Sequence, residues 1–271
     1  MKKCFALALL LIFLLTMAGC ATQSNASLQT PERASFDSPE DAVIAYLEGL
    51  RYSDLDRMIG AFALESYVEN YNFEALLNRV RVYSPALEIR MPNANALVTA
   101  MNIENRRARI VDGIIFQYIL LSDPEFNMTA PHVIEDGQAG EFVSRFNESL
   151  NAPTLNSIEV LGFIPPEALM ELYLSEANQS NIMRQAEVLG ADQLISRVAV
   201  FEMDGNKYLL LVDAVEYSER WYISQLGGNI SVLLGISHMW FGLLPVYLAD
   251  EGIDIFDGID LQALMALMIP R

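Results

Sequence analysis

The stretch ISRVAVFEMDGNKYLLLVDAVEYSERWYISQL, residues 195–226, decides the fold. Two runs rich in β-branched, aromatic and aliphatic residues flank Asp204-Gly205, a dipeptide that is typical of two-residue hairpin turns. Ser218-Glu219 marks a second turn, and residues 220–226 form a third run of the same kind. The pattern predicts an antiparallel meander of three strands. Because helical patterns surround this meander, the predicted fold class is α+β.

Strand alternation predicts which side chains of the second run share a face of the sheet. One face receives Tyr208, Leu210, Val212 and Ala214, and the other receives Leu209, Leu211, Asp213 and Val215. Asp213 is therefore a carboxylate among apolar neighbours, and two interpretations follow. It is either a general base with a raised pKa or an ion-pair partner of Arg197 or Arg220 across the sheet. We favour the ion pair, because ion-pair networks also perturb pKa values.

The N-terminal half, about 38–155, is predicted to be rich in helices. Ser38-Pro39-Glu40-Asp41 combines an N-cap serine, a proline at the first helical position and an acid in the first turn, which indicates a helix start. A second short helix follows the same signal at 53–56, and further helices are expected over 73–82, 95–122 and 141–150. The long helix carries an apolar stripe at three- and four-residue steps. The stripe consists of Leu97, Met101, Ala108, Val111, Ile115 and Tyr118.

The sheet-containing part, about 156–229, begins with a predicted strand over 157–163. Predicted helices from Pro165-Pro166-Glu167 and over 175–189 precede the meander. This order of elements, and the ending ERWYISQLGG (219–228), resembles the NTF2-like fold. The resemblance implies a cavity between a curved sheet and helices, and in some members isomerase or dehydratase chemistry. The long helix and the tail, 230–271, depart from that small fold and would be an inserted or separate helical part.

The N-terminal segment predicts where the protein resides. Lys2 and Lys3 precede an uncharged, leucine-rich run over 5–15, which is typical of a signal peptide and short for a membrane span. The following Met17-Ala18-Gly19-Cys20 resembles the bacterial lipobox. That resemblance implies cleavage before Cys20, diacylglycerol on the Cys20 sulfur and usually an acyl group on the new amine. The alternative is an ordinary signal peptide with an incidental cysteine.

The chain is thus predicted to consist of a signal peptide over 1–19, a lipidated tether over 20–37 and an α+β extracytoplasmic domain over 38–271. Cys4 would leave with the signal peptide and Cys20 would carry lipid, so no thiol remains for a disulfide, a metal or a nucleophile. Two or three acyl chains anchor a protein firmly, whereas one does not. We therefore expect a lipid-anchored protein of the cell envelope that faces outside the cytoplasm.

The net charge of the chain restricts the classes of partner that it is expected to bind. The 17 basic and 35 acidic residues give a formal net charge of −18, and loss of Lys2 and Lys3 with the signal peptide makes it more negative still. Such a surface disfavours nucleic acid and anionic lipid headgroups as partners. Arg106, Arg107 and Arg109 form the single basic cluster. They would hold a phosphate or carboxylate, or form a solvated helix face paired with acids such as Glu104 and Asp112; we favour the solvated face.

Other candidate sites are weaker. His132 and His238 lie far apart and in no metal-ligand spacing. Gly227-Gly228-Asn229 would bind an anion at a helix N-terminus or, as we favour, form a tight turn with Asn229 as N-cap. Four tail acids suggest a calcium loop, but their spacing differs from that of an EF-hand, and a turn-rich segment is favoured. These acids are Asp250, Asp254, Asp257 and Asp260.

The segment 231–249 contains no Asp, Glu, Lys or Arg. Its length would allow a membrane span, but it contains Gly235, His238, Gly242 and Pro245 and lacks flanking basic residues. We favour two short buried helices, with an exposed surface for a protein partner as the alternative.

Three functions remain open. The favoured one is a non-catalytic envelope module that binds a protein partner or a small ligand, with no catalytic, cofactor-binding or metal-binding residue assigned. The second is an NTF2-like cavity enzyme of isomerase or dehydratase type that uses a sheet carboxylate such as Asp213 beside a Tyr or His. The third is a solute-binding receptor for a transporter, which ranks last because repeated βα units are missing.

Overall fold

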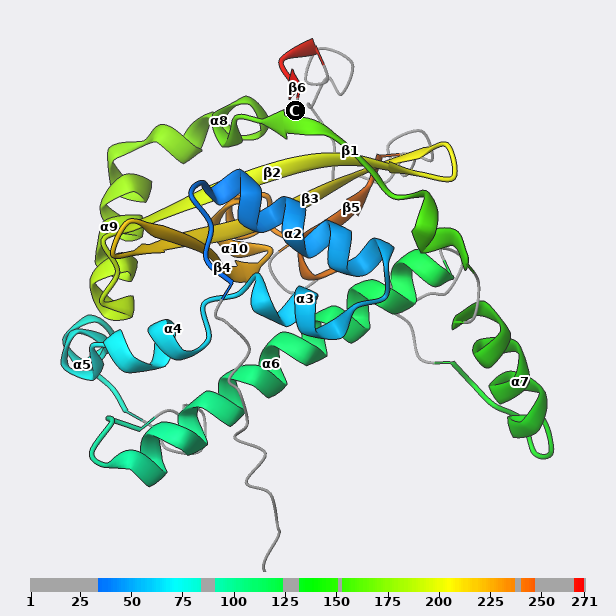
Figure 1. Cartoon of the computed structure of the whole chain (residues 1–271), viewed down its shortest axis with the longest axis horizontal. Coiled ribbons are helices and arrows are strands. Elements are labelled where there is room, and N and C mark those ends of the chain that lie inside the picture. The colour runs from blue at the N-terminus through cyan, green and yellow to red at the C-terminus, as the bar shows by residue number, and fades with distance from the viewer. Residues whose placement is uncertain are drawn as a thin grey trace, which may run out of the picture. The chain divides into compact units, whose positions relative to one another are not determined.

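The meander predicted from residues 195–226 forms the centre of a computed structural model of the protein (Figure 1). Strands β2 (Gln193–Met203), β3 (Asn206–Tyr217) and β4 (Arg220–Leu226) pair antiparallel in chain order. Asp204 and Gly205, which join β2 to β3, have φ values of 50° and 78°. These left-handed conformations match the right-handed twist of the two strands, which is why this dipeptide is a reliable hairpin signal.

The structure describes residues 34–83, 91–123, 132–150, 153–236, 240–246 and 266–270. Residues from Ser35 onward form one compact unit. The predicted signal peptide, Cys20 and most of the predicted tether lie outside the described residues. The four acids of the tail and His238 also lie outside them.

Three further strands complete the sheet. β1 (Glu159–Ile164) pairs antiparallel with β2, and β6 (Ile269–Pro270) pairs with the outer side of β1. β5 (Leu243–Pro245) pairs with the first part of β3, and β4 pairs with the rest of it. The described sheet therefore has the order β4-β3-β2-β1-β6, with β5 beside β3. Together with the helices it confirms the predicted α+β fold, in which a helix-rich N-terminal half precedes an antiparallel meander.

The described helices follow the predicted order. In the N-terminal half they are α2 (Pro39–Arg51), α3 (Leu55–Gly60), α4 (Glu65–Asn70), α5 (Phe73–Val80), α6 (Ala96–Ser122) and α7 (Ala139–Leu150). In the second half they are α8 (Pro166–Leu169), α9 (Glu176–Leu189) and α10 (Gly228–Leu233), and short 3₁₀ turns span Pro153–Ser157, Glu171–Leu174 and Trp240–Gly242. The short helix α4 has no counterpart in the sequence prediction.

Both faces of the sheet are buried, and the predicted alternation along β3 is confirmed. Tyr208, Leu210 and Val212 pack with α2, α3 and α6 in one apolar cluster. Leu209 and Leu211 belong to a second cluster on the opposite face, with residues of α4, α8, α9 and α10. Figure 1 shows α2 lying across the strands, with α9 near the left-hand ends of the strands and the long α6 below. Burial on both faces supplies the hydrophobic core that holds the described domain together.

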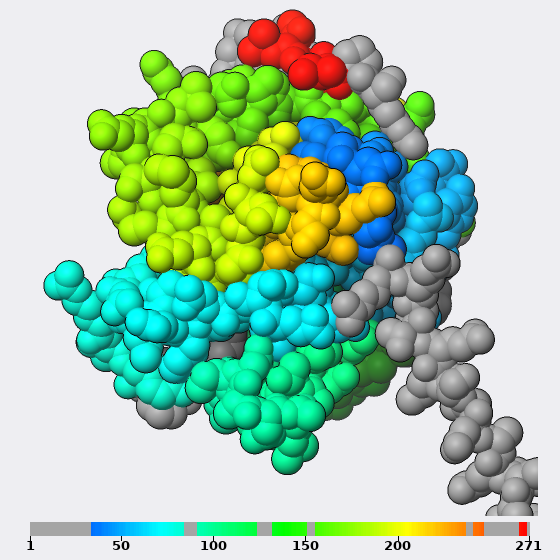
Figure 2. All heavy atoms as spheres, turned by 60° about the vertical axis from the view of Figure 1, so that its left-hand side comes forward, coloured from blue at the N-terminus to red at the C-terminus, as the bar shows by residue number. Residues whose placement is uncertain are grey.

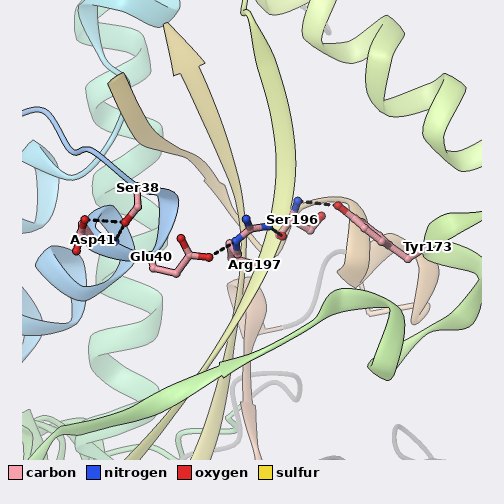
Figure 3. Close-up of polar contacts among 6 residues, drawn as sticks. All are labelled: Ser38, Glu40, Asp41, Tyr173, Ser196 and Arg197. Carbon is pink, nitrogen blue, oxygen red and sulfur yellow. Dashed lines mark hydrogen bonds and ion pairs between the residues drawn. The ribbon is translucent and has the colours of Figure 1, made fainter. Parts of the chain in front are cut away.

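The start of α2 shows how local sequence chemistry places a helix on the sheet. The Ser38 hydroxyl accepts a hydrogen bond from the Asp41 backbone N–H at 3.1 Å, so the predicted N-cap is confirmed. Glu40, in the same first turn, forms an ion pair with Arg197 of β2 at 2.5 Å (Figure 3). This ion pair and the buried apolar face of α2 fix the helix against the strands.

Helix α6 begins after the N-cap Asn95 and has the predicted length, but the predicted apolar stripe is not its buried face. Leu97 and Ile115, two members of that stripe, are 70% and 51% exposed. The buried face instead includes the polar residues Asn102 and Gln117. The Gln117 amide group donates to the Phe241 carbonyl at 2.6 Å and accepts from the Tyr46 hydroxyl at 2.7 Å. These partners satisfy the amide, so its burial carries little desolvation cost.

Candidate functional site

A cavity of about 250 Å³ lies between α4, α6 and β4. Figure 2 shows the cyan α4–α5 segment between the α9 layer and the teal N-terminal part of α6, which places α4 directly over α6. Helix α4 contributes Tyr67 and Val68, with Phe62 and Tyr71 beside it. The remaining lining residues are Met91, Asn93, Asn102, Asn105, Arg106, Arg109, Ile110, Gly113, Ser224, Gln225, Leu226 and Phe241.

A β-bulge in β4 shapes one wall of this cavity. Asp213 pairs with Gln225 and Ala214 pairs with Ile223, so Ser224 is an extra residue in β4. Bulges of this kind bend a strand and redirect its backbone groups. Here the Ser224 carbonyl accepts a hydrogen bond from the guanidinium of Arg106.

Arg106 is held in a defined position in the wall. Its Nε donates to the Ala63 carbonyl at 3.4 Å, and its guanidinium carbon lies 4.0 Å from the centre of the Tyr67 ring. That distance is within the range of a cation–π interaction. Tyr67 in turn stacks on Tyr71, with 6.0 Å between ring centres. The arginine and the two rings thus form a preorganised aromatic and cationic surface.

Three asparagine side chains, Asn93, Asn102 and Asn105, belong to the cavity wall. The Asn102 side-chain amide donates to the Met91 carbonyl at 2.8 Å and to the Asn93 side-chain oxygen at 3.0 Å. Asn93 donates to the Val68 carbonyl at 2.5 Å, which connects the segment before α6 to α4. By contrast, within the described part of the chain the side chains of Asn105 and Arg109 form no hydrogen bond or ion pair. Both side chains are therefore available to a ligand.

The basic cluster therefore divides between two surfaces. Arg107 contacts Glu104 at 3.8 Å, as expected for a solvated helix face. Arg106 and Arg109 line the cavity, where Arg106 is partly buried and Arg109 is exposed, so a ligand contact for these two stays a prediction. The sequence did contain a signal for this arrangement. Asn105 and Arg106 lie three and four residues after Asn102, and Arg109 lies four and three residues after them, so the four residues share one face of α6.

Asp213 is buried among apolar neighbours, and the favoured ion pair is wrong. Arg197 pairs with Glu40, and Arg220 pairs with Asp37. The Asp213 carboxylate instead accepts hydrogen bonds from neutral donors. The Ser196 hydroxyl lies at 2.7 Å, the Gln225 amide at 3.2 Å and the Asn229 backbone N–H at 3.0 Å. Burial raises the pKa of Asp213 to about 6, and the three hydrogen bonds oppose that rise.

The Asp213 network explains the glycines after β4. Gly227 and Gly228 have φ values of 84° and 64°, which confirms the expected tight turn. Asn229 is not the N-cap, because it lies inside α10 and points its backbone N–H at Asp213. The anion at this helix start is therefore the protein's own carboxylate. The Asn229 amide pairs with Asn178 of α9 at 2.9 Å, which ties α10 to α9.

The described part of the apolar segment 231–249 belongs mostly to the core. It completes α10, forms a 3₁₀ turn and ends in β5 rather than forming the two expected helices. Ile236, Leu243 and Leu244 are buried, whereas Val232 is 61% exposed. A protein partner bound through this segment stays a prediction.

Neither a metal site nor a membrane span is found within the described ranges. No group of three His, Cys, Asp or Glu side chains is placed to hold a metal ion there. No helix in these ranges combines the length and the apolar character that crossing a membrane requires.

The comparisons with known proteins leave the family open. The sequence matches no family model and no curated protein. Among solved structures, the chain is similar to a cystatin-like protein from Ruminococcus gnavus ATCC 29149, with 17% identity and a TM-score of 0.39. The match covers 68% of this chain but 39% of that protein. The resemblance to NTF2-like domains accordingly stays a prediction.

Proposed function

We propose that this chain is a lipid-anchored envelope protein whose extracytoplasmic domain binds a small molecule without transforming it. The binding site is the cavity between α4, α6 and β4. Lipid on Cys20 holds the protein at the membrane, and the acidic surface keeps nucleic acid out of its set of partners.

One observation carries this proposal, namely the composition of the cavity wall. The lining combines aromatic rings, amides and two arginines. Within the described residues it contains no Asp, Glu, His, Lys or Cys, so the Ser224 hydroxyl in the wall has no carboxylate, imidazole or amine of the lining beside it to act as a general base. Ligand cavities of proteins are typically apolar with a few placed polar groups, and this wall has that character.

The alternative, an NTF2-like enzyme, requires a carboxylate that meets a Tyr or His in the cavity. Asp213 is 1% exposed and is not a lining residue. Its hydrogen-bond donors are Ser196, Gln225 and the Asn229 backbone. Because Gln225 lies between Asp213 and the cavity, the carboxylate supports the wall and does not face a substrate. The geometry therefore favours binding over turnover.

Native mass spectrometry of the chain from Ala21 onward tests the proposal. We expect a reproducible additional mass of a small molecule after gentle purification, and its loss after partial unfolding and refolding. Loss of the same mass in a variant that fills the cavity, Gly113→Leu, would place the molecule between α6, Leu226 and Phe241. A bare protein mass, together with no binding of small molecules to the purified protein, would contradict the proposal.

A further inference from the structure

We infer that the cavity takes a small organic anion, whose charged group contacts Arg109 and Asn105 and whose apolar body packs on the aromatic wall. This inference rests on the proposed function and specifies its ligand class. It follows from three properties of the site, which are its charge, its free polar groups and its size.

The charge of the wall is opposite to that of the protein. The whole chain has a formal charge of −18, yet the described lining contains Arg106 and Arg109 and no acidic side chain. In so acidic a protein, a cavity that excludes carboxylates and includes two guanidinium groups concentrates positive potential at one place. Arg109 is exposed, so its charge faces a ligand that enters from solvent, and the positive potential attracts an anion to the cavity.

The side chains of Arg109 and Asn105 have the donor groups that bind an oxyanion. Arg109 and Asn105 stand four residues apart on α6, so their side chains lie on the same face of the helix. Neither makes a hydrogen bond or an ion pair within the described ranges. A guanidinium group presents parallel N–H donors that match the two oxygens of a carboxylate or phosphate. The Asn105 amide adds a further donor beside it.

The rest of the wall fits an apolar body. Phe62, Ile110, Leu226 and Phe241 also line the cavity, and the ring of Tyr67 is already stacked on Tyr71. An engineered cavity of about 150 Å³ accommodates benzene. The 250 Å³ present here therefore suits a ligand of about ten non-hydrogen atoms, such as an aryl or short alkyl acid.

Isothermal titration of the mature lipoprotein in a non-ionic detergent tests the ligand class. The probes are phenylacetate and phenyl phosphate as anions and phenylacetamide as their neutral counterpart. We expect at least one anion to bind ten-fold more tightly than phenylacetamide, and its affinity to fall when the salt concentration is raised. Use of both anions distinguishes a carboxylate from a phosphate ligand.

Two arginine variants show whether the cavity is responsible. Arg109→Gln should weaken anion binding at least ten-fold and leave phenylacetamide binding unchanged. Arg107→Gln is the matched control, because Arg107 lies two residues away on α6 and pairs with Glu104 outside the cavity. This control should bind the anions as the wild-type protein does.

The outcomes separate the inference from the proposed function. Equal binding of phenylacetamide and the anions, or equal effects of the two arginine variants, would overturn the anionic ligand class and leave a small-molecule cavity in place. Failure of both anions to bind would overturn the inference as well. The proposed function itself fails only if native mass spectrometry also finds a bare chain and phenylacetamide does not bind.

Discussion

Asp213 is a residue whose environment can be tested by pH. Burial raises the pKa of this carboxyl group to about 6 in the folded protein, whereas the unfolded chain titrates near 3.8. Between pH 3.8 and about pH 6, the Asp213 carboxyl group holds its proton more tightly in the folded state than in the unfolded chain. The contribution of Asp213 to stability is therefore greatest below about pH 4 and is lost as the pH rises through 6. Above that pH the charged group costs about 3 kcal/mol, at about 1.4 kcal/mol per pH unit.

We expect Asp213→Asn to remove this pH dependence. Urea unfolding of the wild-type and variant proteins between pH 4 and pH 7.5 would measure it. The wild-type protein should lose up to about 3 kcal/mol of stability relative to the variant as the pH rises. Asn cannot ionise, and it keeps an oxygen that accepts from the Asn229 N–H. Parallel pH profiles of the two proteins would contradict the assignment of a raised pKa.

At the scale of elements, the turn between β4 and α10 depends on a glycine that contacts Asp213. Gly228 has a φ of +64°, and a Cβ atom at this position would overlap the Asp213 carboxyl group. Gly228→Ala should therefore combine a strained backbone, about 1–2 kcal/mol, with overpacking of about 1–3 kcal/mol. The measurement is the free energy of unfolding in urea.

Gly205 provides the matched control for that experiment. It has a φ of +78° in the β2–β3 hairpin, but no atom lies within 4 Å of a Cβ added there. Gly205→Ala should cost the backbone strain alone, about 1–2 kcal/mol. If the two substitutions destabilise the protein equally, the close approach of α10 to Asp213 has no energetic consequence, which would contradict the description of this turn.

The elements also show what sequence can predict. The hairpin at Asp204-Gly205 and the start of α6 at Asn95 were predicted correctly, because a turn dipeptide and an N-cap act on neighbouring residues. The sequence does not predict the buried face of α6. Gln117 is buried there because it forms hydrogen bonds with Tyr46 and Phe241, which are 71 and 124 residues away. Polar burial of this kind depends on partners that no local pattern reveals.

The cavity illustrates the same limit for the candidate site. The polar face of α6 could be found from the spacing of Asn102, Asn105, Arg106 and Arg109. The other walls could not, since α4 was not predicted and the bulge at Ser224 has no sequence signature. Because they are close in sequence, Arg106, Arg107 and Arg109 are predicted to form one basic cluster. In the structure Arg107 pairs with Glu104 and does not line the cavity.

For the whole molecule, function depends on where the domain is held. The described unit begins at Ser35, and the predicted lipid-bearing Cys20 precedes it by 15 residues. A polar segment of this length reaches at most about 50 Å when fully extended, at about 3.3–3.6 Å per residue. The cavity would therefore sample ligands close to the membrane surface.

Anchoring itself is tested with two cysteine variants of the full chain, expressed in bacteria with an alkyne analogue of palmitate. We expect the wild-type protein to be labelled and to sediment with membranes, because two or three acyl chains bind a bilayer stably whereas one does not. Cys20→Ala should lose the label and the thioether-linked lipid. Cys4→Ala is the control, since Cys4 lies within the predicted signal peptide and should leave labelling intact. An unlabelled wild-type protein cleaved near residue 20 would indicate an ordinary signal peptide, and the cavity would then belong to a freely diffusing protein.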